Sequence, residues 1–263
     1  MSGRPAPGMN MDGQRMPGMN TAESIPGMGL LGAASGLTLR PLTSSVDAGQ
    51  ASPYRFRIIQ AGGTPLTSYQ AGQTKLLHFY LVRDDLTGFE HLHPALAPDG
   101  TWIVTIRPAD AGSYRVFTQF TGRPAGKAVS LVLSRPLTVT GPASPPIPLP
   151  APTASTQADG YTLAITGDPR AGTAAPLTVT VTRNGKPVTD LQPYLGTYAH
   201  LTAFHQGDLA FAHLHPLGAV NGDHGGPALH FDAVLPEPGS YRLFLQFRAG
   251  GRLRTAQVTV PVS

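Results

Sequence analysis

The feature that most constrains the fold is an internal repeat of short segments in which apolar and polar residues alternate. GFEHLHP at residues 88–94 recurs as AFAHLHP at residues 210–216, an offset of 122 residues. GSYRVFTQF at residues 112–120 recurs as GSYRLFLQF at residues 239–247, an offset of 127 residues that indicates a longer loop in the second copy. The chain is therefore an internal duplication, and each half is expected to fold into the same structure.

The alternation has the period of two that is typical of β-strands, and about seven short strands fall in each half. The high content of glycine (31 residues) and proline (27 residues) supplies the turns between them, for example at Asn184-Gly185. Residues 110–114 and 237–241 each end in Gly-Ser-Tyr, which matches the tyrosine corner of immunoglobulin-like sandwiches. We therefore predict an all-β chain of two tandem immunoglobulin-like or cupredoxin-like β-sandwich domains.

Two segments of unusual composition divide the chain into four parts. Residues 1–34 are rich in Met, Gly and Pro and have too few apolar residues to form a core, so we expect a disordered tail. Residues 142–153 contain six prolines and predict a stiff linker. The two sandwich domains are then expected at residues 35–141 and 154–263.

Charge and cysteine content exclude several functions. Lys and Arg (19) exceed Asp and Glu (15) by only four and form no basic stripe, so nucleic acid is not an expected partner. The chain has no cysteine, which excludes disulfides, thiolate metal sites and cysteine nucleophiles. No segment has the roughly 18 consecutive apolar residues of a membrane-spanning helix. We expect an extracytoplasmic protein, secreted or in the cell envelope, whose signal peptide or anchor is missing from this sequence.

The histidines have the most informative spacing. In each half, one histidine is followed thirteen residues later by the sequence His-Leu-His-Pro. If the intervening residues form a β-hairpin, Tyr80 lies opposite His91, and the period of two directs all three imidazoles of the first half to one face. Pro94 and Pro216 are expected to end the strands and to keep the histidines near a sheet rim. The predicted metal ligands are His78, His91 and His93 in one triad and His200, His213 and His215 in the other.

Two alternatives remain open for these histidines. They could have an architectural role, satisfying backbone groups at a sheet edge in both copies. Three further histidines, His205, His224 and His230, have no counterpart in the first half, and their roles stay undecided. The spacing also does not decide whether two separate sites form or one site is shared.

The methionines lie only in the first 28 residues, so they are not core residues. Thioether sulfur is a soft ligand that suits Cu(I), whereas imidazole suits Cu(II) and Zn(II). A chain with both types of ligand points to copper as Cu(I) or Cu(II), with zinc as the alternative metal. The methionines could instead be incidental in a low-complexity linker or follow from a mistaken start site. The candidate thioether ligands are Met9, Met11, Met16, Met19 and Met28.

Several of these segments together resemble a known group of proteins. The Met-rich leader, the paired LLHFYLV…HLHPALAPDGTW and YLGTYAHLTAF…HLHP segments, and the ending PEPGSYRLFLQF resemble extracytoplasmic heavy-metal-binding sandwich proteins of actinobacteria, similar in style to YtkA-like and CopC-like copper proteins. The resemblance covers the chain from about residue 36. It implies an exported copper-binding or copper-tolerance protein. The chain lacks the N-terminal histidine motif of CopC, and a blue-copper site would need cysteine.

The main hypothesis is thus a non-enzymatic protein that sequesters or delivers copper, or confers tolerance to it, and that exchanges the ion with a copper transporter or chaperone. One alternative is a histidine-ligated metal enzyme similar to a superoxide dismutase. The other is a structural or adhesive module of two sandwiches in which the histidines bind no metal.

Overall fold

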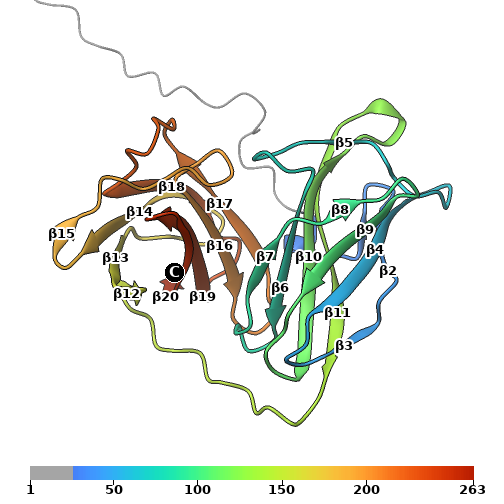
Figure 1. The fold of residues 1–263 in the computed structure, drawn as a ribbon, viewed down its shortest axis with the longest axis horizontal. Coiled ribbons are helices and arrows are strands. Elements are labelled where there is room, and N and C mark those ends of the chain that lie inside the picture. The colour runs from blue at the N-terminus through green and yellow to red at the C-terminus, as the bar shows by residue number, and fades with distance from the viewer. Residues whose placement is uncertain (1–25) are drawn as a thin grey trace, which may run out of the picture.

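The computed structural model describes residues 26–263, apart from the side chains of residues 26, 27, 213 and 215. Two β-sandwich domains lie side by side, and an extended linker passes beneath them (Figure 1). The predicted fold class, two repeated all-β domains, is confirmed. The described residues contain no helix that is long and apolar enough to cross a membrane.

Domain 1 consists of two sheets with a hydrophobic core between them. One sheet has the order β1 (Ala33–Ala34), β2 (Leu37–Pro41), β4 (Ser52–Gln60), β9 (Thr101–Ile106) and β8 (Ala95–Leu96). The other has the order β3 (Ser45–Asp47), β11 (Val129–Thr140), β10 (Gly112–Gly122), β6 (Leu77–Arg83) and β7 (Glu90–Leu92), and β5 (Tyr69–Gln70) pairs with β10. Alternate residues of these strands, including Phe56, Phe79 and Trp102, fill the space between the sheets.

The strands of domain 2 are joined into one continuous sheet. Its order is β12 (Ser155–Ala158), β13 (Tyr161–Thr166), β14 (Ala174–Arg183), β18 (Ala228–Val234), β17 (Phe211–Leu217), β16 (Ala199–His205), β19 (Gly239–Ala249) and β20 (Arg252–Val262), with β15 (Lys186–Pro187) on β14. The sheet is continuous because β17 pairs first with β16 and then, from residue 215, with β18.

The two prolines after the His-Leu-His sequences behave differently. Pro94 lies between β7 and β8, as predicted. The prediction that Pro216 ends its strand is wrong, because Pro216 lies within β17 opposite Phe231. The pairing with β16 has already ended at Leu214, so no ladder hydrogen bond on that side needs a donor from Pro216.

Both predicted tyrosine corners are present. The hydroxyl of Tyr114 donates to the carbonyl of Asp110 (2.9 Å), and the hydroxyl of Tyr241 donates to the carbonyl of Glu237 (3.1 Å). Each bond ties the start of a long strand to the loop before it. The repetition of this contact shows that the two halves share one architecture.

The predicted tail is too long at its C-terminal end. Residues 26–34 contain a 3-10 helix, η1 (Pro26–Gly29), and the short strand β1, so they belong to the fold. Leu30 packs against the apolar cluster between the domains. Apolar contact thus offsets the low propensity of a Gly-rich segment. The rest of the predicted tail, residues 1–25, lies outside the described residues.

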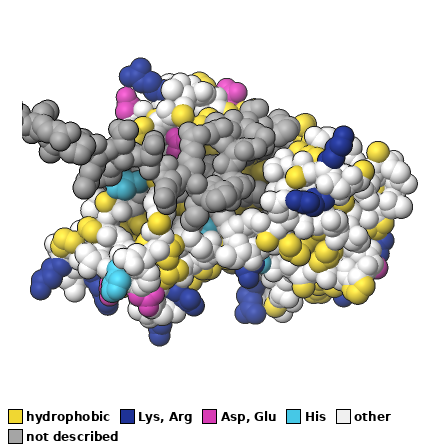
Figure 2. Space-filling view, turned by 90° about the horizontal axis from the view of Figure 1, so that it is seen from above, with side chains coloured by type: hydrophobic (Ala, Val, Ile, Leu, Met, Phe, Trp, Pro, Cys, Tyr) yellow, Lys and Arg dark blue, Asp and Glu magenta, His cyan; other side chains and the backbone are white. Residues whose placement is uncertain are grey.

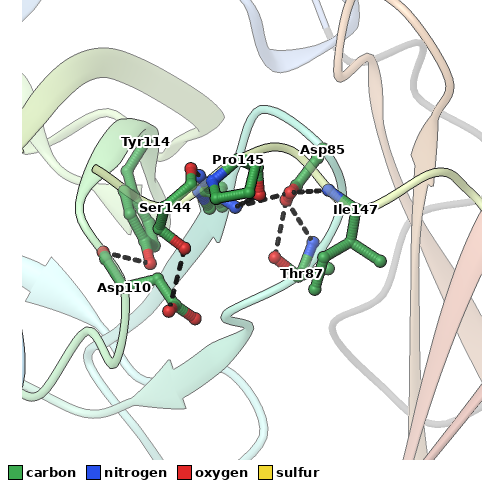
Figure 3. A network of polar contacts seen from close by, with 8 residues as sticks. Asp85, Thr87, Asp110, Tyr114, Ser144, Pro145 and Ile147 are labelled. Atoms are coloured by element: carbon green, nitrogen blue, oxygen red, sulfur yellow. Dashed lines mark hydrogen bonds and ion pairs between the residues drawn. The ribbon is translucent and has the colours of Figure 1, made fainter. Parts of the chain in front are cut away.

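The proline-rich linker lies between the end of β11 and the start of β12, and domain 1 holds its first part. Arg83 and Asp85 form an ion pair (2.7 Å) whose side chains are only 6% and 7% exposed. Arg83 donates to the carbonyls of Ser144 and Pro145, and Asp85 accepts from the backbone N–H of Ile147 (Figure 3). The linker is therefore fixed to β6 and to the turn that follows it, and does not act as a free spacer.

An aromatic cluster joins the two domains. Phe89 of domain 1 stacks on Phe244 of domain 2, with ring centroids 4.1 Å apart. Phe211 is the counterpart of Phe89, and Phe117 is the counterpart of Phe244. These two rings are also stacked, with centroids 5.7 Å apart. Because equivalent residues make reciprocal contacts, the interface has the form of an isologous dimer within one chain. The buried members of this cluster are Tyr80, Val82, Leu86, Phe117, Val132, Phe204, Leu209, Phe211 and Phe244.

Candidate metal centre

The first predicted triad comes together at the edge of domain 1 that faces domain 2. His78 lies on β6 and His91 on β7, and the register pairs Tyr80 with His91, as predicted. His93 follows the end of β7. Leu92 points to the other side and packs against the domain 1 core. One ring nitrogen from each of the three histidines lies within 4.8 Å of the others.

The separations within the triad match those around a single ion. Nδ1 of His78 and Nε2 of His91 lie 3.1 Å apart. The three ring centroids are separated by 5.3, 5.0 and 4.8 Å. Two imidazoles bound to a tetrahedral ion through bonds of about 2.0–2.1 Å would have nitrogens about 3.3 Å apart and centroids about 5 Å apart. The triad therefore needs only small side-chain movements to bind a metal.

Hydrogen bonds on the outer side of the triad determine which nitrogens carry protons. Nε2 of His78 lies 3.1 Å from the carbonyl oxygen of Gly72, so it is the donor. Nδ1 of His91 lies 2.6 Å from Oε1 of Gln246 and donates in the same way. The neutral rings then present unprotonated Nδ1 of His78 and unprotonated Nε2 of His91 to each other. Two lone pairs at 3.1 Å repel, and a cation between them removes the conflict.

His93 contributes a third nitrogen. Within the described part of the chain, its buried Nε2 has no hydrogen-bond partner. Leaving a buried polar atom unsatisfied costs about 1–3 kcal/mol, and native structures rarely contain such atoms without a reason. An ion at the centre of the triad would satisfy it.

Burial keeps the triad neutral at physiological pH. Desolvation lowers the pKa of His78 and lowers that of His91 well below its usual value. Desolvation, together with the neighbouring His78 and Lys75, lowers the pKa of His93 to about 3. Neutral imidazole is the form that binds metal ions, so these rings need not lose a proton first.

The second predicted triad is described only in part. His200 lies buried on β16, and the register pairs Thr202 with His213 on β17, as the repeat predicts. The side chains of His213 and His215 lie outside the described residues. The ring of His200 lies across the interface from the first triad, 5.9 Å from His91 and 6.4 Å from His78 between centroids.

Sequence reasoning missed the turns that orient His78 and His200. Nε2 of His200 lies 3.2 Å from the carbonyl of Tyr194, which is the counterpart of Gly72 at the offset of 122 residues. Both carbonyls belong to tight turns in which the two central residues have positive φ: Gln73 and Thr74 in domain 1, and Leu195 and Gly196 in domain 2. The turn sequences differ, so only the shared offset could have signalled their common role.

Among the described residues, the metal-ligand grouping contains only His78, His91 and His93. His205 pairs with Asp208 at 2.8 Å, and His224 and His230 are exposed. Met28 lies on η1, whereas Met9, Met11, Met16 and Met19 fall outside the described residues. Lys and Arg side chains are scattered over the face seen in Figure 2 and form no single patch there.

Comparison with known proteins identifies the family. A model for a domain of unknown function, DUF8832, matches residues 33–134 and again residues 156–263. The chain belongs to the DUF8832 family. Its two copies coincide with the two sandwich domains, and the match provides no link to YtkA-like or CopC-like copper proteins. No functionally curated protein matches the sequence.

Several solved structures share the sandwich arrangement at low similarity. The Escherichia coli adhesin FdeC is 18% identical, with 88% of this chain and 65% of that chain covered and a TM-score of 0.28. Domains 4 and 5 of the S-layer protein SbsC are 14% identical, with 87% and 98% covered and a TM-score of 0.22. Invasin, a bacterial integrin-binding protein, is 13% identical, with 86% and 39% covered and a TM-score of 0.24. The chain thus spans 65% of the length of the FdeC structure. At this identity the likeness concerns the sandwich fold alone.

Proposed function

We propose that this chain is a non-enzymatic, extracytoplasmic protein that binds a transition metal ion, copper with zinc as the alternative, at His78, His91 and His93. The observation that carries the proposal is the convergence of three imidazole nitrogens within 4.8 Å. Outer hydrogen bonds, donated by His78 to the carbonyl of Gly72 and by His91 to Oε1 of Gln246, direct the lone pairs of these two rings inward. This combination is typical of metal sites, where second ligand shells fix the tautomer of each histidine.

The chemistry of the ligands favours copper or zinc over hard cations. The grouping contains only imidazoles among the described residues, and imidazole suits copper and zinc, whereas calcium and magnesium prefer oxygen. The Met-rich segment at residues 7–20 would supply thioethers for Cu(I) and would take part in transfer to a copper transporter or chaperone. Both this transfer and the location outside the cytoplasm follow the resemblance to exported copper-binding sandwich proteins. We infer a role in binding rather than catalysis; among the described residues no carboxylate lies in the grouping to act as a general base.

A metal titration tests the proposal. The full chain is titrated with Cu²⁺ and with Zn²⁺ by calorimetry at pH 7, beside the variants His93→Ala and His230→Ala. His230 is an exposed histidine on β18 that contacts Thr178, so its variant controls for non-specific binding. We expect His93→Ala to weaken the tightest site by more than about 100-fold, because it removes a direct ligand. Equal affinity in the two variants, or no binding by the wild type, would contradict the proposal.

A structural or adhesive module is the second candidate, and one contact favours it. The hydrogen bond from His91 to Gln246 joins the domains through buried groups, so the histidines could serve only to fix the domain orientation. In that case the wild type would bind neither ion, and His91→Phe, which removes the buried bond and leaves Oε1 of Gln246 without its donor, would lower the stability. Metal binding would instead make His91→Phe lose affinity for the ion.

A further inference from the structure

We propose that His200 of domain 2 is a fourth ligand of the same ion, so that the metal bridges the two domains. This inference rests on the proposed metal binding at His78, His91 and His93. It goes further because residues of both repeats would then bind the same ion, and the ion would hold the two domains together.

The ring of His200 is the first reason. Its centroid lies 5.9 Å from that of His91 and 6.4 Å from that of His78. The rings of two histidines on one tetrahedral ion are about 5 Å apart, so His200 needs to move inward by roughly 1 Å. Side-chain rotation of this size is common when a site binds its ligand.

The tautomer of His200 is the second reason. Nε2 faces the carbonyl oxygen of Tyr194 at 3.2 Å, and a carbonyl can only accept, so Nε2 carries the proton. The lone pair of the neutral ring is then on Nδ1, the type of nitrogen that His78 uses on the other side.

The local two-fold relation of the domains is the third reason. His78 and His200 are equivalent residues, related by the offset of 122, and each is held by an equivalent turn carbonyl. Across an isologous interface, equivalent residues near the axis necessarily approach each other. An ion close to this axis can therefore take ligands from both repeats.

Contacts around the site also cross the interface. His91 donates to Gln246 of domain 2 at 2.6 Å. Its ring stacks on Tyr80 at 4.5 Å, and Tyr80 in turn contacts Phe211 of domain 2 at 5.3 Å. A metal that fixes His91 therefore also fixes groups that belong to the other domain, and relative motion of the two sandwiches would break the site.

Co²⁺ is the probe for the test, because its visible absorption reports both ligand type and coordination number. The full chain is titrated with Co²⁺ at pH 7 beside His200→Ala, His200→Gln and the control His230→Ala. His200→Gln keeps a polar side chain near the turn carbonyl and serves if His200→Ala fails to fold, which circular dichroism and Trp102 emission reveal. We expect the wild type and His230→Ala to give the same intense tetrahedral bands. Both His200 variants should give shifted, weaker bands and at least about a tenfold loss of affinity.

The outcomes separate this inference from the proposed function. If the wild type gives no Co²⁺ spectrum and binds neither Cu²⁺ nor Zn²⁺, both fail. If the wild type and His200→Gln give the same bands and the same affinity, while His93→Ala loses both, the triad binds metal without domain 2 and only the bridging proposal is overturned.

Discussion

The stacked pair Phe89 and Phe244 provides a quantitative test of the domain interface, because the two rings belong to different repeats. Phe244 is 1% exposed and its centroid lies 4.1 Å from that of Phe89, with an angle of 14° between the planes. Replacing Phe244 by Ala should lower the free energy of unfolding by about 3 kcal/mol, near the lower limit for a buried phenylalanine. Because Phe89 is only half-buried, Phe89→Ala should lower the free energy of unfolding by less, about 2 kcal/mol.

The double variant isolates the contact itself. Aromatic pairs contribute about 0.5–1.5 kcal/mol beyond their burial, so the double variant should be about 1 kcal/mol more stable than the sum of the single losses predicts. Urea unfolding followed by circular dichroism supplies the free energies. Fluorescence of Trp102, the sole tryptophan, reports domain 1 and checks that both domains unfold together.

A matched control uses Phe247, which lies on the same strand β19 but in the core of domain 2, where it contacts Tyr161. Phe247→Ala should be at least as destabilising as Phe244→Ala, yet its coupling with Phe89→Ala should be within about 0.5 kcal/mol of zero. A coupling energy for Phe89 and Phe244 no larger than that of this control would refute the described interface.

Three further predictions concern the linker contact, the tyrosine corner and the metal. Burial alone would raise the pKa of Asp85, but hydrogen bonds, first of all from Thr87, lower it below 3.8. The ionised carboxylate of Asp85 therefore stabilises the fold fully above about pH 5. This stabilisation is lost as the pH falls through the folded-state pKa. Asp85→Asn should consequently flatten the acid limb of a plot of urea midpoint against pH, and an unchanged limb would contradict this. Tyr241→Phe removes the bond to Glu237 and should cost about 1 kcal/mol in urea unfolding; a loss under about 0.3 kcal/mol would show that the corner contributes little. Zn²⁺ at 100 times its dissociation constant should stabilise the wild type by about 2.7 kcal/mol in thermal unfolding but not His93→Ala, and equal shifts in both would exclude the triad as the site.

Much of the fold could be predicted from the sequence because its signals are local. Alternation of apolar and polar residues specifies strands, and the Gly-Ser-Tyr segments specify the two tyrosine corners. The spacing of His78 and His91 also predicted the hairpin register correctly, since the period of two fixes which residues can share a face. The continuation of β17 through Pro216 was missed, because it depends on a change of partner strand that local sequence does not encode.

The arrangement of the two domains could not be predicted in the same way. The contacts of His91 with Gln246 and of Phe89 with Phe244 join residues 155 positions apart, and no periodic pattern reports such a pairing. The sequence left open whether the triads form separate sites. The approach of His200 to the first triad depends on the packing of whole domains.

The most direct test of the central claim is X-ray absorption spectroscopy of the full chain loaded with one equivalent of Zn²⁺. If the histidines converge on one ion, the spectrum will contain nitrogen ligands at about 2.0–2.1 Å together with the multiple scattering typical of imidazole rings. A ligand shell of oxygen or sulfur without imidazole scattering would contradict the claim that His78, His91 and His93 form a metal site.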